Sequence, residues 1–131
     1  MGGARLDGRL ARNLRELNVF MVIDAIISYV YSDPMKAARI FHDKAVLPDG
    51  SIVEMTIWQL PESSPERPHR LKYSLFYGRD GTRIVGYDNE RGKGDHKHLG
   101  AIEAPYKFVN VEKLVADFLA DVERTINEQD A

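Results

Sequence analysis

The side chains best suited to chemistry lie in one short stretch of the sequence, from Arg83 to His98. The stretch starts with alternating apolar residues, continues into a charged loop and contains three glycines. Glycine permits positive φ angles and close approach of a ligand to the backbone, and loops held by a rigid scaffold often carry binding and catalytic groups. The candidate site residues are Arg83, Tyr87, Asp88, Asn89, Arg91, Lys93, His96, Lys97 and His98.

The centre of this prediction is a pair of histidines spaced two residues apart. In an extended chain His96 and His98 point to one side and Lys97 to the other. Histidine titrates near neutral pH, so two imidazoles can act as base and acid when a ribose 2′-OH attacks the adjacent phosphate. Arg or Lys side chains would stabilise the negative charge that develops on that phosphate. The first hypothesis is therefore metal-independent RNA cleavage, which needs no cofactor and assigns no metal ligand.

Other side chains of the stretch have supporting roles in this hypothesis. Tyr87 is the third candidate catalytic residue, for proton transfer or for stacking on a base. Asp88 or Asp95 could fix the tautomer of a histidine. The candidate substrate-binding residues are Arg83, Asp88, Asn89, Arg91, Lys93 and Lys97.

Two other interpretations of the stretch stay open. A metal ion could be held by the two histidines with Asp88 or Asp95 as the third ligand, although no second ligand pair stands at a diagnostic spacing. Alternatively, the stretch is a solvated hairpin tip, because Gly-Lys-Gly-Asp is ordinary turn sequence. His42 and His69 are isolated and are predicted to be structural, and Trp58 is predicted to lie in the core or at a sheet edge.

The segments around the stretch predict an antiparallel sheet. Strands are expected at residues 36–47, 51–60, 69–77, 82–88 and 106–109. Apolar and polar side chains alternate in these segments, and hairpin turns separate them at Pro48-Asp49-Gly50 and at residues 78–81. Connections this short favour a meander of four or five strands.

A C-terminal helix is predicted from Val111 to about Asn127. Asn110 is a suitable N-cap, and Glu112 in the first turn is favourable for the helix dipole. Apolar residues recur at helical spacing over the rest of the segment. The predicted fold class is therefore α+β, with this amphipathic helix covering one face of the four- to five-stranded meander.

The composition is that of a soluble globular protein with one domain. The 131 residues are 44% hydrophobic and 29% charged, and no cysteine is present, which excludes disulfides and cysteine-containing zinc sites. From Glu66 to Lys97, eight Lys or Arg residues stand against five Asp or Glu residues. A basic middle of this kind favours an anionic ligand such as RNA phosphate.

The N-terminal 34 residues are predicted to form an extension, and residues 35–131 a single α+β domain. The composition changes after Pro34, and Leu10, Leu14 and Leu17 have helical spacing. The apolar run at residues 19–31 is too short to span a bilayer and contains Asp24. No membrane anchor is therefore expected, and the expected location is the cytoplasm.

The run from Tyr77 to His98, with its Gly-Tyr-Asp-Asn and Gly-Asp-His-Lys-His segments, resembles the TumE-like toxins of bacterial and archaeal toxin–antitoxin systems. Residues 46–55 and 105–114 share the resemblance, which covers about Met35 to the C-terminal helix. It implies a small toxin encoded beside a helix-turn-helix type antitoxin, and it strengthens the case for RNA as the target. Two function classes follow, a toxin acting as a small ribonuclease or a non-catalytic nucleic-acid- or protein-binding module.

Overall fold

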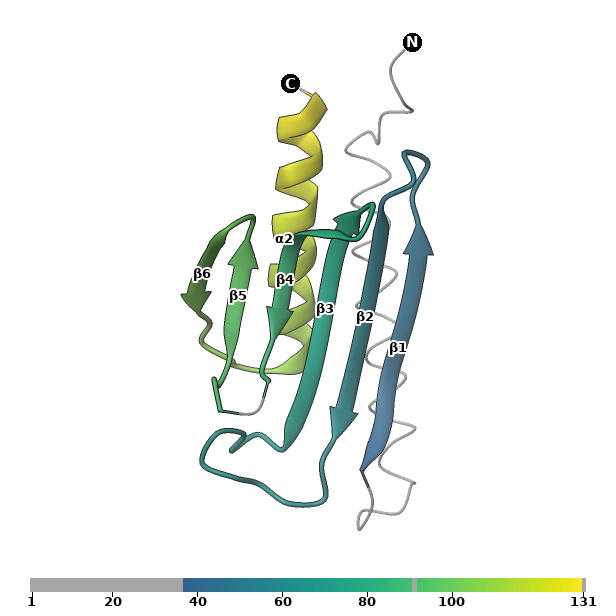
Figure 1. Ribbon diagram of the computed structural model, residues 1–131. Coiled ribbons are helices and arrows are strands. Elements are labelled where there is room, and N and C mark those ends of the chain that lie inside the picture. The colour runs from purple at the N-terminus through teal and green to yellow at the C-terminus, as the bar shows by residue number, and fades with distance from the viewer. Residues whose placement is uncertain (1–36, 91, 131) are drawn as a thin grey trace.

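The computed structural model describes residues 37–90 and 92–130, and these residues form an α+β fold (Figure 1). The elements are β1 (Ala38–Val46), β2 (Ile52–Gln59), β3 (Leu71–Arg79), β4 (Thr82–Asp88), β5 (His96–Leu99), β6 (Ile102–Pro105) and α2 (Val111–Asp130). All neighbouring strands are antiparallel, and their order in the sheet is the order of the chain. The predicted fold class and the meander are therefore confirmed.

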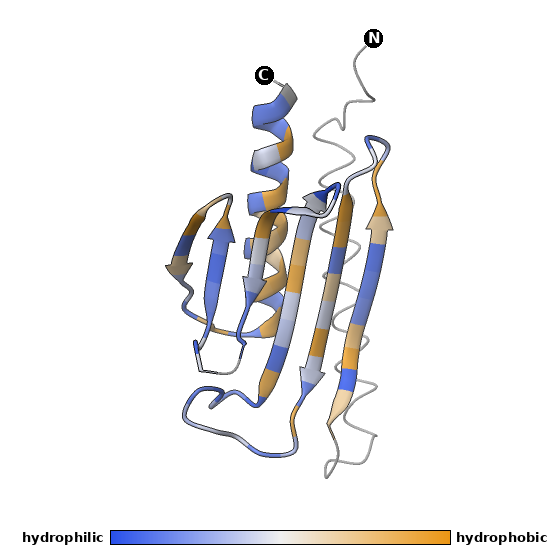
Figure 2. Ribbon diagram, viewed as in Figure 1, coloured by the Kyte–Doolittle hydropathy of each residue, from blue (hydrophilic) through white to orange (hydrophobic). Residues whose placement is uncertain are grey.

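The predicted number of strands was wrong, because the described residues form a sheet of six strands instead of four or five. The additional strands β5 and β6 lie where the sequence analysis expected a loop, and the strand expected at Tyr106–Val109 is irregular. Strand β5 is hydrophilic over most of its length (Figure 2), so an apolar alternation could not reveal it. The Tyr106 hydroxyl donates a hydrogen bond to Asp117 of α2 at 2.8 Å, which ties the irregular segment to the helix.

Both hairpin turns that the sequence predicted are present. Gly50 has a φ of 85° between β1 and β2. Between β3 and β4, Asp80 and Gly81 have φ angles of 52° and 77°. Two consecutive positive φ angles are the requirement of a type I′ turn, whose twist matches that of the flanking strands.

Helix α2 packs on β3 and β4 with its apolar stripe. The Asn110 side chain accepts a hydrogen bond from the backbone N–H of Lys113 at 2.8 Å, so the predicted N-cap is confirmed. The buried residues of the stripe are Val111, Leu114, Val115, Phe118, Leu119, Val122 and Ile126. The ring of Phe118 meets the ring of Tyr87 edge to face, with 5.7 Å between centroids. Packing of this kind fixes α2 over the middle of the sheet.

Strand register assigns each side chain to one of two faces of the sheet. Met55, Leu75 and Tyr87 pair across β2, β3 and β4 and are buried on the face toward α2. The neighbouring row contains Ser74 and Asp88, and successive residues of a strand point to opposite faces. This second row therefore lies on the face opposite α2, which is called the open face here. Among the described residues no helix lies on the open face, which is the face seen in Figure 1.

Candidate functional site

Strands β4 and β5 bring Asp88, His96 and His98 together on the open face, and these three residues are called the β4–β5 cluster. Asp88 pairs directly with His96 in the ladder, and Gly86 pairs with His98. One nitrogen from each histidine and one carboxylate oxygen all lie within 4.8 Å of one another. The two imidazole rings are 4.9 Å apart between centroids and nearly perpendicular, at 79°. The prediction that both imidazoles share one side of the strand is confirmed.

The ring of His96 is held in one orientation by its own backbone neighbour. Its Nδ1–H donates to the carbonyl oxygen of Gly94 at 2.9 Å. Its Nε2 lies 2.6 Å from Asp88 Oδ1, but the two atoms lack hydrogen-bond geometry. Asp88 Oδ1 is buried and has no hydrogen-bond partner among the described residues. With Nδ1 donating to Gly94, so close an approach of Nε2 to a carboxylate oxygen is favourable only with a proton on Nε2 or with a cation shared by the two atoms.

The second imidazole, that of His98, lies slightly farther from the carboxylate. Its Nε2 is 3.7 Å from Asp88 Oδ2, and the residue is only 8% exposed. Burial lowers the pKa of His98, and the nearby positive charge of Arg83 lowers it further. The neutral imidazole is therefore favoured, and this is the form that accepts a proton or ligates a metal.

A cation lies beside the cluster because a glycine makes room for it. Arg83 Nη1 is 3.8 Å from Asp88 Oδ2. A Cβ atom at Gly86 would come within 2.5 Å of the Cδ atom of Arg83. The missing side chain at Gly86 thus lets the arginine lie along the sheet next to the carboxylate, so the predicted substrate-binding residue Arg83 lies beside the cluster.

Glu103 of β6 completes the polar surroundings of the cluster. It pairs with His98 across β5 and β6, and its Oε1 is 3.8 Å from His96 Nε2. Glu103 is not among the predicted site residues, because no strand was expected at β6. Gly100, which has a φ of 61° and stands between two short alternating segments, was the available signal for this hairpin.

Tyr87 and Lys97 lie on the face toward α2 and do not reach the cluster. The Tyr87 hydroxyl donates to the carboxylate of the buried Asp121, and burial raises the pKa of Tyr87. Lys97 Nζ is 3.7 Å from Asp121 Oδ2 and 5.8 Å from the centre of the Tyr87 ring. The sheet separates both residues from the histidines, so this placement gives no support to their predicted roles in proton transfer and substrate binding.

The remaining candidates occupy the connection between β4 and β5. Asn89 is buried, and its side chain accepts from the Tyr73 N–H at 3.0 Å and donates to the Leu71 carbonyl at 2.7 Å. It therefore extends the β3–β4 pairing beyond the end of β4. Lys93 is exposed in the turn, and Arg91 lies outside the described residues.

A second histidine–carboxylate arrangement lies on the face toward α2, formed by His69, Tyr73 and Asp95 and called the His69 cluster. His69 Nδ1 accepts the Leu71 N–H at 3.1 Å, so its Nε2–H donates to the two Asp95 oxygens at 3.1 and 3.2 Å. The Tyr73 hydroxyl donates to Asp95 Oδ1 at 2.6 Å. Burial raises the pKa of Tyr73, and the Asp95 bond raises it further. Asp95 therefore fixes the tautomer of His69, and the carboxylate that contacts His96 is Asp88.

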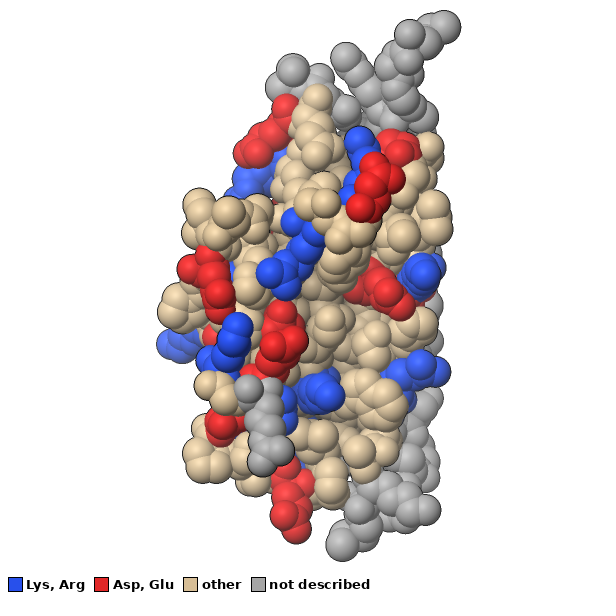
Figure 3. Space-filling model, viewed as in Figure 1, with Lys and Arg blue, Asp and Glu red and all other residues tan. Residues whose placement is uncertain are grey.

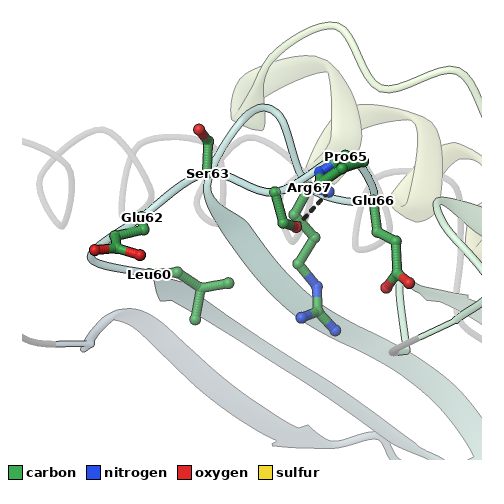
Figure 4. Close-up of a pocket in the computed structure, with 7 residues that line it drawn as sticks. Leu60, Glu62, Ser63, Pro65, Glu66 and Arg67 are labelled. Atoms are coloured by element: carbon green, nitrogen blue, oxygen red, sulfur yellow. Dashed lines mark hydrogen bonds between the residues drawn. The ribbon is translucent and has the colours of Figure 1, made fainter.

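The loop between β2 and β3 forms a pocket of about 400 Å³ (Figure 4). Its lining residues are Leu60, Glu62, Ser63, Ser64, Pro65, Glu66 and Arg67. The Arg67 guanidinium donates a hydrogen bond to the carbonyl of Asn89 at 2.8 Å. The Glu66 carboxylate accepts one from the backbone N–H of Gly92 at 2.8 Å. These hydrogen bonds attach the loop to the connection between β4 and β5, so the loop helps to hold that connection in place.

A family model described as Toxin TumE matches residues 21–126. The match includes all six strands and most of α2. It begins before the domain boundary predicted at Met35, and that boundary stays a prediction because residues 1–36 lie outside the described part of the chain. No curated protein matches the chain, and no solved structure matches it. Among the described residues, no helix has the length and apolar character that crossing a bilayer requires.

Proposed function

The chain belongs to the TumE toxin family, and we propose that it is the toxin of a toxin–antitoxin pair and cleaves RNA at the β4–β5 cluster. The observation that carries the proposal is the convergence of two buried imidazoles on one carboxylate, with a guanidinium beside them on the open face. In this proposal the target is cytoplasmic RNA. The partner that restrains the toxin is a cognate antitoxin of the helix-turn-helix type.

The proposed reaction uses the 2′-OH of RNA as the nucleophile. The 2′-oxygen forms a bond to the adjacent phosphorus while the bond from phosphorus to the 5′-oxygen breaks. The cluster takes the proton from the 2′-OH and returns a proton to the leaving 5′-oxygen. Arg83 neutralises charge on the phosphate oxygens. The products are a 2′,3′-cyclic phosphate and a 5′-hydroxyl.

A row of side chains across β1, β2 and β3 is suited to hold a nucleotide of the same RNA strand, near the nucleotide that lies at the cluster. Arg39 pairs with Trp58, and Trp58 pairs with Lys72, so an indole lies between two cations on the open face. Trp58 is 38% exposed on β2, which lies between β1 and β3, so its predicted place in the core or at a sheet edge was wrong. Its exposed ring is available for stacking on a base. Two residues along a strand span roughly 7 Å and two neighbouring strands roughly 10 Å across the sheet, so Trp58 of β2 lies on the order of 12 Å, about two nucleotide steps, from Asp88 of β4.

The open face carries charged side chains of both signs. Lys and Arg side chains are spread over this face between Asp and Glu side chains (Figure 3). Aromatic platforms flanked by cations bind single strands with little sequence preference. A strand held in this way would present a ribose and its phosphate to the cluster.

The row gives a direct assay of RNA binding, because Trp58 is the single tryptophan of the chain. Addition of a short single-stranded RNA is expected to quench its fluorescence. Trp58→Ala is expected to weaken RNA binding by about 1–3 kcal/mol, the usual contribution of one stacked base. Unchanged fluorescence at saturating RNA would place the RNA elsewhere.

The test of cleavage compares purified wild-type protein with a His96→Ala/His98→Ala variant and a matched control. His42→Ala is the control, because His42 is an exposed histidine whose ring contacts Glu54 at 3.2 Å on β2. Wild type and control should cleave RNA, should leave an RNA with a single 2′-deoxy substitution at the cut site intact, and should arrest growth without antitoxin. Full activity of the double variant would overturn the assignment to this cluster.

The Trp58 row also supports a second candidate, a binding module that acts on RNA without cutting it. In that case the double variant still binds RNA and arrests growth, and the wild type binds RNA with a 2′-deoxy substitution as tightly as unmodified RNA. Product analysis on a denaturing gel separates the two candidates.

A further inference from the structure

We propose that the β4–β5 cluster binds a divalent transition-metal ion, with Zn²⁺ as the best-matched ion. The ligands would be Nε2 of His96, Nε2 of His98 and the carboxylate of Asp88. The use of this ion in RNA cleavage rests on the proposed function, whereas the binding of the ion does not.

The three ligand atoms lie at distances that suit one shared ion. Zinc bonds of about 2.0–2.1 Å in a tetrahedral site place neighbouring ligand atoms about 3.3 Å apart. The two imidazole nitrogens are 2.6 and 3.7 Å from Asp88 oxygens, and all three ligand atoms lie within 4.8 Å. Small side-chain rotations therefore suffice to bring the three atoms into the coordination sphere of one ion.

Two of the ligand atoms also lack a hydrogen-bond partner in the cluster, although they lie close together. The Nδ1–H of His96 is fixed by the Gly94 carbonyl, which is the usual way in which proteins orient a metal-binding imidazole. This bond directs the lone pair of Nε2 into the cluster, where the buried Asp88 Oδ1 has no hydrogen-bond partner among the described residues. A cation bound by both atoms satisfies each of them without requiring a hydrogen bond between them.

The three ligands are also of the chemical types that zinc prefers. Two imidazoles and one carboxylate suit Zn²⁺ and its first-row neighbours, whereas Mg²⁺ and Ca²⁺ prefer oxygen ligands. Three protein ligands leave one position of a tetrahedral ion open, as in catalytic zinc sites. Glu103 is half exposed and lies 3.8 Å from His96 Nε2, so it is placed to accept a hydrogen bond from a water in that fourth position.

A metal ion also accounts for the orientation of the histidines better than metal-free proton transfer does. A base and an acid that act on one phosphate need to lie on its two sides. Here both imidazoles converge on the same carboxylate and are buried to within 8% exposure. His96, His98 and Asp88 would hold the ion, and the chemistry it would supply is a lowered pKa of a water in the one open position, so that the resulting hydroxide could take the 2′-OH proton.

The experiment measures metal in tag-free protein purified without chelators. Elemental analysis after Zn²⁺ loading and desalting is expected to give about one equivalent for wild type and for His42→Ala. His96→Ala and His98→Ala are expected to lose stoichiometric binding. Glu103→Gln is expected to weaken binding about 10–100-fold, as for residues that orient metal-bound groups.

A second measurement on the wild type keeps the proposal testable if these variants fail to fold. Titration with Co²⁺ should produce the visible absorption of a four- or five-coordinate ion, and Zn²⁺ should abolish it. Absence of both bound zinc and this absorption in the folded wild type overturns the proposal, as does equal loss of metal in His42→Ala. RNA cleavage in excess EDTA would overturn the catalytic use of the ion. Metal binding without RNA cleavage would support the metal site and overturn the proposed function.

Discussion

The two faces of the sheet each carry a histidine–carboxylate cluster, and the two clusters differ in whether their polar atoms are satisfied. In the His69 cluster both imidazole nitrogens, the Tyr73 hydroxyl and the Asp95 carboxylate have hydrogen-bond partners. In the β4–β5 cluster a buried oxygen of Asp88 has none among the described residues, although an imidazole nitrogen lies 2.6 Å away.

This difference separates a structural group from a functional one. A fully satisfied buried network stabilises the folded state and leaves nothing to bind a ligand. An unsatisfied buried acceptor beside two imidazoles destabilises the free protein, and a bound ligand can offset this by supplying the missing partner. Residue types alone do not distinguish the clusters, because each contains histidine and aspartate.

The largest expected effect comes from breaking the β4–β5 cluster. His98→Ala should reduce the rate of RNA cleavage about 10²–10⁴-fold, the usual range for positioned acid–base groups. The free energy of unfolding of the metal-free protein should fall only by the packing energy of this buried imidazole, because His98 Nε2 lies 3.7 Å from the Asp88 carboxylate and makes no strong hydrogen bond to it. Cleavage rates and denaturant unfolding measure the two quantities. A variant that is strongly destabilised but fully active would reverse the assignment of the two clusters.

The next largest effect is expected from breaking the His69 cluster. Asp95→Ala leaves the Tyr73 hydroxyl and His69 Nε2–H without their acceptor, and a buried unsatisfied donor costs about 1–3 kcal/mol. For two such donors the free energy of unfolding should fall by about 2–6 kcal/mol, while cleavage per folded molecule stays near the wild-type rate. Asp95→Asn retains one acceptor oxygen and should be less destabilised. A loss of activity as large as that of His98→Ala would show that Asp95 belongs to the reactive centre.

A smaller effect is expected at Tyr87, which the sequence suggested as a catalytic residue. Tyr87→Phe removes one buried hydrogen bond to Asp121 and should cost about 1 kcal/mol of stability. Arg124 and Lys97 remain paired with Asp121, so the carboxylate keeps partners. The rate of RNA cleavage should stay within a factor of about two of the wild-type rate, because Tyr87 lies on the face opposite the histidines and makes no proton transfer there. A loss of 100-fold or more in kcat would restore the catalytic role of Tyr87.

The sequence predicts a strand or a helix where the buried side chains of that element are apolar and recur at regular spacing. Strands β1 to β4 and helix α2 were predicted because their buried side chains are apolar and recur with the period of a strand or a helix. Strand β5 gives no such signal, because its buried residues His96 and His98 are polar and face Asp88. The seven residues between β4 and β5 also do not fix the register that pairs Asp88 with His96.

Part of the site could nevertheless have been deduced from alternation alone. Adjacent residues of a strand point to opposite faces, so Tyr87 cannot share a face with Asp88 within β4. The same rule separates Lys97 from both histidines. The acceptor of His69 could not be deduced, because Asp95 is 26 residues away in the chain and only the tertiary fold brings them together.

The smallest expected effect compares two lysines on opposite faces of the sheet. Lys72 lies on the open face next to Trp58 in the ladder, whereas Lys97 faces Asp121 of α2. Lys72→Met should weaken RNA binding and reduce the slope of log affinity against log salt by about 0.7, the value for one phosphate contact on a single strand. Lys97→Met should leave this slope unchanged, because no phosphate reaches that face. Fluorescence titrations of Trp58 over a range of salt concentrations measure both slopes. Equal reductions for the two variants would mean that RNA wraps around the sheet edge, and a reduction for Lys97→Met alone would move the RNA-binding surface to the face toward α2.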